Sequence, residues 1–172
     1  MERIDNEGFF RRIISYGPVI VLFVSVLNKI DLNYLNLKFF SFNFVYILIF
    51  YWTLKDPKSL RYGAIFFAGL INDVVLNTPI GLSSFNYLLI CGVTAYMRNI
   101  TLRPSAMNDW VFFLVVILII NSISFVAINI IYSVELSYIY FLVNSGMTFL
   151  LYPIFSYLFN IYKKLFILKS ND

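Results

Sequence analysis

The chain has 172 residues, of which 60% are hydrophobic and 13% charged, and its mean hydropathy is +0.81. A soluble domain carries about 25% charged residues, and a chain this short cannot bury so much apolar surface in a core surrounded by water. The composition therefore excludes a soluble globular protein and predicts an integral membrane protein. At about 20 residues per crossing, the length allows six or seven spans in one membrane domain over residues 1–172.

Several classes of functional site are also excluded. Histidine is absent and Cys91 is the single cysteine, so the commonest general base, the commonest metal ligand and an intramolecular disulfide are missing. No glycine-rich phosphate loop, metal-ligand spacing or nucleophile–base pair occurs. The net charge is +4, but the basic residues do not cluster into one patch. We expect no enzyme activity, no cofactor, no metal and no nucleic-acid partner.

Apolar runs alternate with charged or turn-forming residues along the chain. They predict an all-α bundle of six transmembrane helices, over about residues 13–30, 37–54, 60–76, 80–97, 110–131 and 138–162. The first run lacks a small-x-small cleavage site, so we expect an uncleaved span. The third and fourth are short, and a re-entrant hairpin around residues 77–79 stays open as an alternative. Asp109, just before Trp110, is expected to cap the fifth helix.

The distribution of basic residues predicts the orientation of the bundle. With six spans and a cytoplasmic N-terminus, 11 of the 13 lysines and arginines fall on the cytoplasmic side, and only Lys29 and Lys38 fall outside. The positive-inside rule selects this arrangement over its reverse. We therefore expect both termini in the cytoplasm and the turn at residues 77–79 outside. The loops between the runs hold at most about ten residues, which argues against an enzyme of soluble substrates.

Asp73 is the one acidic residue well inside an apolar run. A carboxylate in hydrocarbon costs at least a few kcal/mol, so it is either functional or locally paired. A relay of protons or ions, as in an accessory subunit of an ion-translocating complex, needs a second titratable group, and none lies at depth. We favour a structural interpretation, in which Asp73 caps the turn at 77–79 or pairs with a neighbouring span. Gly69, one turn earlier, and the stripe of Ala64, Ala68 and Asn72 are expected to face protein.

Polar and small residues also occur in the last two runs: Asn121, Ser122, Ser124, Asn129, Asn144, Ser145, Gly146 and Thr148. We interpret them as interhelical hydrogen-bonding groups, with a lined pocket as the alternative. Pro153 should kink the sixth span or leave a carbonyl group free. Tyr152 and Pro153 are expected to shape a packing seam or a partner interface.

The centre of the chain resembles a known family. The stretch Gly69-Leu70-Ile71-Asn72-Asp73, followed by Pro79-Ile80-Gly81-Leu82, resembles the "GL–D … P-L-G" segment of the bacterial rod shape-determining protein MreD family. The length, six spans, a fifth span led by Trp110 and the Tyr152-Pro153 pair also fit. The match is specific over about residues 63–98. Carried over residue by residue, the motif corresponds to Gly69, Leu70, Asp73, Pro79, Gly81 and Leu82.

The resemblance implies a multi-pass protein of the bacterial inner membrane that helps organise lateral cell-wall synthesis. It implies binding to MreC, a single-span membrane protein, and through it to the actin-like MreB filament and the peptidoglycan synthases of the elongation complex. A homo-oligomer is left open. This family also looks similar in fold to the substrate-binding subunits of energy-coupling-factor transporters.

That fold similarity supplies an alternative function, a small-molecule (vitamin-type) binding subunit of a membrane transporter. The alternative predicts a polar pocket between spans, near Asp73 and the turn at 77–79. The outer loops carry few clusters of aromatic and polar residues suited to holding a solute, which argues against it. We therefore favour a non-enzymatic scaffold subunit.

Overall fold

The computed structural model of the chain describes residues 16–27, 42–100, 105–132 and 138–168. These residues form α-helices joined by short turns, so the all-α class is confirmed for this part of the chain. The helices are α2 (Gly17–Leu27), α3 (Phe44–Lys55), α4 (Tyr62–Leu76), α5 (Leu82–Ile100), α6 (Ala106–Tyr132) and α7 (Tyr138–Tyr162), and α7 continues as the π-helical turn η2 (Lys163–Leu168).

Each predicted run overlaps one of these helices, with differences at the boundaries. Within the described part of the run expected over 37–54, α3 begins at Phe44. Phe42 and Asn43 are non-helical, and the Asn43 N–H donates to Thr148 Oγ1 of α7 (2.9 Å). An apolar aromatic run does not by itself distinguish helix from extended chain. Several predictions concern residues outside the described part of the chain, namely residues 13–15, 28–30 and 37–41 and the basic residues Arg3, Arg11, Arg12, Lys29, Lys38, Arg103 and Lys169.

The prediction that Asp109 caps the fifth helix is wrong. α6 begins at Ala106, so Asp109 lies inside its first turn, and its N–H donates to the Ser105 carbonyl (3.0 Å). Its carboxylate pairs instead with Lys55 at the end of α3 (2.6 Å). A negative charge in the first turn still interacts favourably with the helix dipole, which explains why the sequence pattern resembled a cap.

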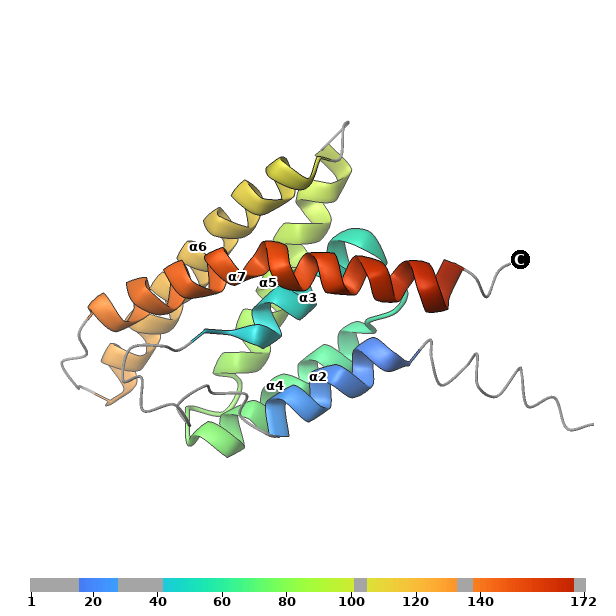
Figure 1. Cartoon of the computed structure of the whole chain (residues 1–172). Helices are drawn as coiled ribbons and strands as arrows, with labels where there is room; N and C mark the ends of the chain where they lie inside the picture. The colour runs from blue at the N-terminus through green and yellow to red at the C-terminus, as the bar shows by residue number, and fades with distance from the viewer. Residues whose placement is uncertain (1–15, 28–41, 101–104, 133–137, 169–172) are drawn as a thin grey trace, which may run out of the picture.

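α3 forms the centre of the bundle. Residues 45–53 are buried without interruption, and α2, α5 and α7 all pack against this helix. A helix that is apolar on every face is stable only when other elements surround it. Its Phe50 packs on Phe113 of α6 (5.0 Å between ring centroids) and on Tyr152 of α7 (5.6 Å), which lie stacked at 4.6 Å. Figure 1 shows α3 enclosed, with α2 and α4 side by side below it.

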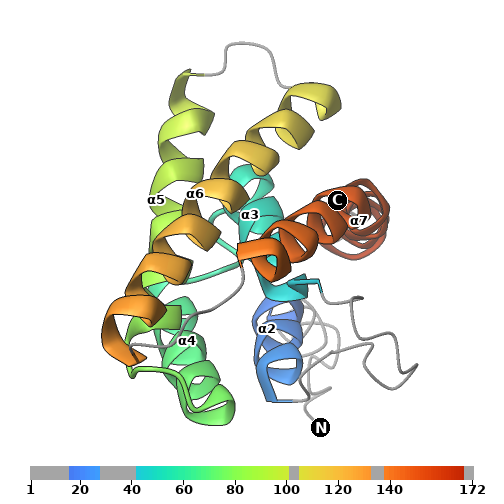
Figure 2. The ribbon, with the colours of Figure 1, turned by 90° about the vertical axis from the view of Figure 1, so that its left-hand side faces the viewer.

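Basic side chains gather at the C-terminal end of α3. Arg98 of α5 donates to the Thr53 carbonyl (3.4 Å), and Lys163 of η2 donates to the Lys55 carbonyl (2.8 Å). The last carbonyls of a helix have no partner within the helix, and cations stabilise this negative end of its dipole. The turn between α4 and α5 lies at the opposite end of the bundle (Figures 1 and 2). The basic residues that meet here belong to the set predicted to be cytoplasmic.

Pro153 frees a carbonyl group in α7, and a neighbouring helix uses it. Proline has no N–H to donate to the carbonyl four residues earlier, which is that of Phe149. The indole N–H of Trp110 in α6 donates to this carbonyl (2.9 Å), and its ring stacks on Phe149 with centroids 4.7 Å apart. The prediction that Pro153 leaves a carbonyl group free is therefore confirmed, and the free group joins α6 to α7.

Two of the described helices are long and apolar enough to cross a membrane, over Ala106–Ile131 and Phe141–Leu165. α2, α3 and α4 are apolar but have 11, 12 and 15 residues, fewer than the roughly 20 of a full span. Large apolar side chains are exposed on several helices, among them Phe67, Ile130 and Leu150, as a lipid-facing surface requires. The count of six spans stays a prediction.

The Trp110–Phe149 hydrogen bond gives a prediction for stability. Trp110→Phe keeps the stacked ring but removes the donor, so we expect the free energy of unfolding to fall by about 1 kcal/mol. In a Pro153→Ala background the new N–H of residue 153 can serve the Phe149 carbonyl, and the same substitution should cost clearly less. Thermal unfolding of the four proteins in one detergent measures both costs. Equal costs in the two backgrounds would contradict this account of α7.

Candidate functional site

Asp73 binds the turn that follows its own helix. The side chain is fully buried, and both carboxylate oxygens accept hydrogen bonds. Oδ1 accepts from the Ser83 N–H (2.9 Å) and the Thr78 hydroxyl (3.0 Å), and Oδ2 accepts from the Gly81 N–H (2.7 Å). This is the capping geometry that the structural interpretation predicted.

The capped helix is α5, which begins at Leu82. The first N–H groups of a helix have no intrahelical acceptor and carry the positive end of the helix dipole. Asp73 supplies a negative acceptor to the N–H groups of Gly81 and Ser83 from the preceding helix. Because this cap comes from α4, it also fixes how the start of α5 lies against α4. The carboxylate is therefore paired within the hairpin, which leaves the relay interpretation without support.

Close packing between α4 and α5 depends on Gly69. A Cβ atom at this position would lie 2.5 Å from the Ser84 nitrogen, too close for any side chain. Ser84 in turn donates to the Phe66 carbonyl of α4 (2.9 Å). The turn between the helices uses Asn77 at φ 53° and Gly81 at φ 100°, a backbone region that glycine and asparagine tolerate best. The prediction that Gly69 faces protein is confirmed.

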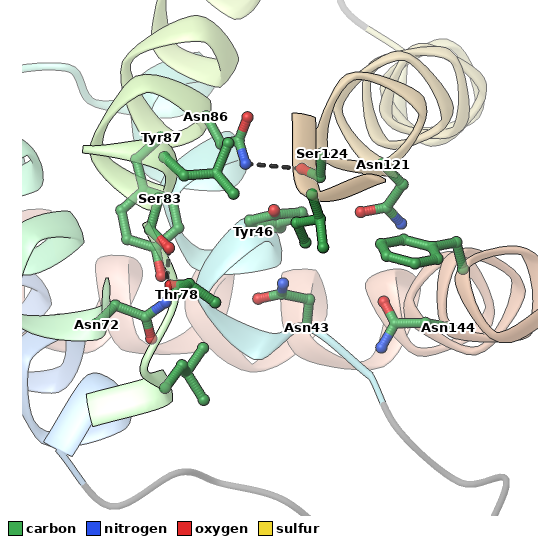
Figure 3. A pocket seen from close by; sticks show the side chains of 14 residues that line it. Asn43, Tyr46, Asn72, Thr78, Ser83, Asn86, Tyr87, Asn121, Ser124 and Asn144 are labelled. Atoms are coloured by element: carbon green, nitrogen blue, oxygen red, sulfur yellow. Dashed lines mark hydrogen bonds between the residues drawn. The ribbon is translucent and has the colours of Figure 1, made fainter. Parts of the chain in front are cut away.

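A polar cavity of about 300 Å³ lies beside this hairpin, among α3, α4, α5, α6 and α7. Ten of its fourteen lining side chains are polar and none is charged. The lining residues are Asn43, Tyr46, Asn72, Leu76, Thr78, Leu82, Ser83, Asn86, Tyr87, Asn121, Ser124, Ile128, Phe141 and Asn144. Figure 3 shows the amides of Asn43, Asn121 and Asn144 around one space. The polar pocket that the transporter alternative predicted near the turn at 77–79 is therefore present.

Serine hydroxyls hold three of the cavity's asparagine side chains. Nδ2 of Asn72 donates to Ser83 (2.9 Å), that of Asn86 to Ser124 (2.7 Å), and that of Asn121 to Ser145 (2.6 Å). The hydroxyls of Ser124 and Ser145 in turn donate hydrogen bonds to the carbonyls four residues earlier (2.9 and 2.7 Å). Each of the three amides thus donates at least one hydrogen bond to a serine of a neighbouring helix or turn. Oδ1 of Asn86 is buried with no partner among the described residues.

A second, larger hollow lies at the other end of the bundle, beside Tyr152 and Pro153. Its volume is about 580 Å³, and α6 and α7 supply most of its walls. Tyr152 is buried, whereas Met107 and Tyr157 on the rim are 66% and 67% exposed. The charged members of the lining, Lys55 and Asp109, are paired with one another. The hollow therefore offers a largely apolar surface without an uncompensated charge.

The predicted site residues form two separate groups. Gly69, Asp73, Pro79, Gly81 and Leu82 meet in the α4–α5 hairpin together with Leu70 of α4, and Leu82 also lines the polar cavity. Tyr152 and Pro153 lie in the second hollow. Asn43, Tyr46 and Asn86 were not singled out from the sequence. The available signal was the number of asparagines within apolar runs, but nothing in their spacing showed that they converge.

The described residues contain no group of three or more histidine, cysteine, aspartate or glutamate side chains that could hold a metal ion. Cys91 is buried, 3.6 Å from the Thr53 hydroxyl. The chemistry that the polar cavity offers is hydrogen bonding by neutral groups.

Comparison with known protein families places the chain in one of them. The family model for "rod shape-determining protein MreD" matches residues 11–166. No curated protein and no solved structure matches the chain. The expected similarity to the substrate-binding subunits of energy-coupling-factor transporters therefore stays a prediction.

Removing the charge of Asp73 should destabilise the α4–α5 hairpin. Asp73→Asn places an amide NH₂ where one carboxylate oxygen accepts a backbone N–H, and hydrogen bonds to charged groups contribute about 1.5–3 kcal/mol. We expect a fall in the free energy of unfolding within this range, and a fall of about 1 kcal/mol for Thr78→Val. Thermal unfolding in detergent measures both. Asp56→Asn, which affects one bond from Ser59 (2.7 Å), is the control; an equal loss there would contradict a special role for Asp73.

Proposed function

Since the chain belongs to the MreD family of rod shape-determining proteins, a family of membrane proteins, we propose that it is a non-enzymatic scaffold subunit of the cell-wall elongation machinery. It has a role in rod shape determination. In this proposal it binds a single-span membrane protein of the MreC type. Through that partner it helps to position the peptidoglycan synthases and the actin-like MreB filament.

The observation that carries the proposal is the hollow beside Tyr152 and Pro153. It lies between two helices that are long and apolar enough to cross a membrane, so a third apolar helix could lie against it. Aromatic side chains, including Trp110 and Tyr157, line the hollow. Tryptophan and tyrosine are among the residues that contribute most binding energy at protein interfaces. Lys55 and Asp109 form an ion pair. An apolar partner that covers them therefore does not bury an unmatched charge.

We place the protein in the bacterial inner membrane as a six-span bundle with both termini in the cytoplasm. The positive-inside tally supports this orientation. Further support comes from the contacts of Arg98 and Lys163 at one end of α3 and from the turn at 77–79 at the other end (Figure 1).

The alternative function, a vitamin-type binding subunit of a transporter, is favoured by one observation, the polar cavity near Asp73. The cavity volume of about 300 Å³ lies at the lower limit of ordinary small-molecule sites. Co-purification distinguishes the two functions, because a scaffold retains a single-span shape-determining partner and a transporter subunit retains an ATPase complex.

Filling the hollow should weaken partner binding. Ser156 lines it, and Ile154 is 56% exposed on the same helix but outside the lining. We expect Ser156→Trp to lower recovery of an MreC-type partner by about tenfold or more, equivalent to the loss of one interface hot spot. Ile154→Trp should leave recovery unchanged. Affinity purification from membranes in mild detergent, with quantitative mass spectrometry, measures both.

Two results would contradict this assignment. Equal recovery of the partner with Ser156→Trp and with the unsubstituted protein would exclude the hollow as the docking site. Absence of any single-span partner, together with unchanged cell shape after deletion of the gene, would exclude the scaffold function itself.

Thiol labelling tests the orientation. Asn77 and Lys58 are both exposed, and the proposed topology places them on opposite sides of the membrane. In a Cys91→Ala background, Asn77→Cys should react with an impermeant maleimide in spheroplasts. Lys58→Cys should react only after permeabilisation. The reverse pattern would invert the bundle, and labelling of both positions in intact spheroplasts would exclude a hairpin that crosses the membrane.

A further inference from the structure

A narrow apolar groove of about 230 Å³ lies between the start of α2, the second half of α3 and the end of α7. Leu48 and Trp52 of α3 are buried beneath it, whereas Val21 of α2 and Leu158 of α7 are 41% and 51% exposed at its sides. A helix is about 10–12 Å across with its side chains, which is too wide for a groove of this volume. A single hydrocarbon chain fits it better.

α2 and α7 meet at one end of this groove. The hydroxyl of Tyr162 lies so close to Gly17 that a side chain at this glycine would collide with it. The end of α3 lies nearby, because Lys163, the next residue after α7, donates to the Lys55 carbonyl (2.8 Å). Figure 1 shows the start of α2, the loop from α3 to α4 and the end of α7 at the same end of the molecule.

Two basic side chains flank the point where α2 and α7 meet. The guanidinium carbon of Arg61 lies over the ring of Tyr16, 5.7 Å from its centroid, and Tyr16 directly precedes Gly17 of the groove. This cation–π contact holds the arginine beside the groove. Lys164 follows two residues after Tyr162 and is exposed. Both cations are therefore placed where a ligand that leaves the groove at this end would meet them.

The positive charge at this end is not matched by negative charge. In the part of the chain that the structure describes, the nearby carboxylates are those of Asp56 and Asp109, and Asp109 is already paired with Lys55 (2.6 Å). No ion pair with another described residue involves Arg61 or Lys164. An apolar groove thus ends beside cations that lack a counter-charge.

We propose that this groove binds an anionic phospholipid. One acyl chain lies between α2 and α7 over Leu48 and Trp52, and the phosphate group lies beside Arg61 and Lys164. A phospholipid joins a hydrocarbon chain to an anion in the order in which the groove and its basic end present their surfaces. An arginine donates two parallel hydrogen bonds to a phosphate, and basic sites between membrane helices suit anionic headgroups.

The test is native mass spectrometry of the full-length protein in an uncharged detergent, titrated with dioleoyl phosphatidylglycerol. Dioleoyl phosphatidylcholine has the same chains without net charge and is the comparison lipid. We expect the anionic lipid to bind at least about fivefold more tightly, which is the factor that one basic side chain contributes near an anionic headgroup. Equal binding of the two lipids would overturn the proposal.

Charge variants locate the headgroup. Arg61→Gln and Lys164→Gln should each weaken phosphatidylglycerol binding about fivefold and leave phosphatidylcholine binding unchanged. Both side chains are exposed, so neither change disturbs the packed interior. Lys58→Gln removes the same charge from the loop that carries Arg61 and is the control. If Lys58→Gln weakens binding as much as Arg61→Gln does, the lipid responds only to net charge and the site is excluded.

A pair of valines on α2 locates the acyl chain. Val21 lines the groove, whereas Val24, 46% exposed, lies outside the lining. Val21→Trp should fill the groove and lower the affinity for phosphatidylglycerol at least about fivefold, the effect of losing an apolar contact of moderate size. Val24→Trp should leave the affinity unchanged. The same loss in both variants, or in neither, would contradict the placement of the chain.

The mass spectra also report another occupant. A dimer that carries no lipid and that Val21→Trp dissociates would assign the groove to a second copy of the chain and overturn the proposal. Failure here is separate from failure of the scaffold function, because the groove shares no lining residue with the hollow tested by Ser156→Trp.

Discussion

α3 has twelve residues and is apolar on every face. Such a helix is stable only where other elements surround it, and the arrangement of the other helices follows from this requirement. α2, α5 and α7 pack directly against it, and Phe113 of α6 reaches its Phe50. In a bilayer the hydrophobic effect does not drive helices together, so close packing and interhelical hydrogen bonds must hold this shell. The Phe50–Phe113–Tyr152 cluster, the Trp110–Phe149 hydrogen bond and the Gly69–Ser84 approach are the contacts that do so.

The short length of α3 also explains why both ends of the bundle are polar. Twelve residues span about 18 Å, less than the roughly 30 Å of a hydrocarbon core. At its C-terminal end, Arg98 and Lys163 bind the last carbonyls. At its N-terminal end the backbone leaves the helix at Asn43, and Asn43 and Tyr46 line the polar cavity. The polar cavity thus lies at the end where this central helix begins.

The sequence allowed the local features to be predicted and left the long-range ones open. Asp73 lies within ten residues of every group it binds, so charge burial and turn signals were enough to expect its role. Gly69 and Pro153 were predictable because small residues and proline act on neighbouring backbone. The start of α3 was not, since Asn43 is fixed by Thr148, 105 residues away. Asn86 and Ser124 meet only when α5 and α6 pack, and no spacing along the chain encodes this.

The local pairing of Asp73 has a consequence for biogenesis. A membrane helix that carries a carboxylate is costly to insert while the charge is unmatched. All the donors of Asp73 arrive within the next ten residues, so the carboxylate can be fully hydrogen-bonded within the α4–α5 hairpin before α6 and α7 are synthesised. Contacts this close in sequence also form quickly. The hairpin can thus act as the first assembled unit, against which the later helices pack.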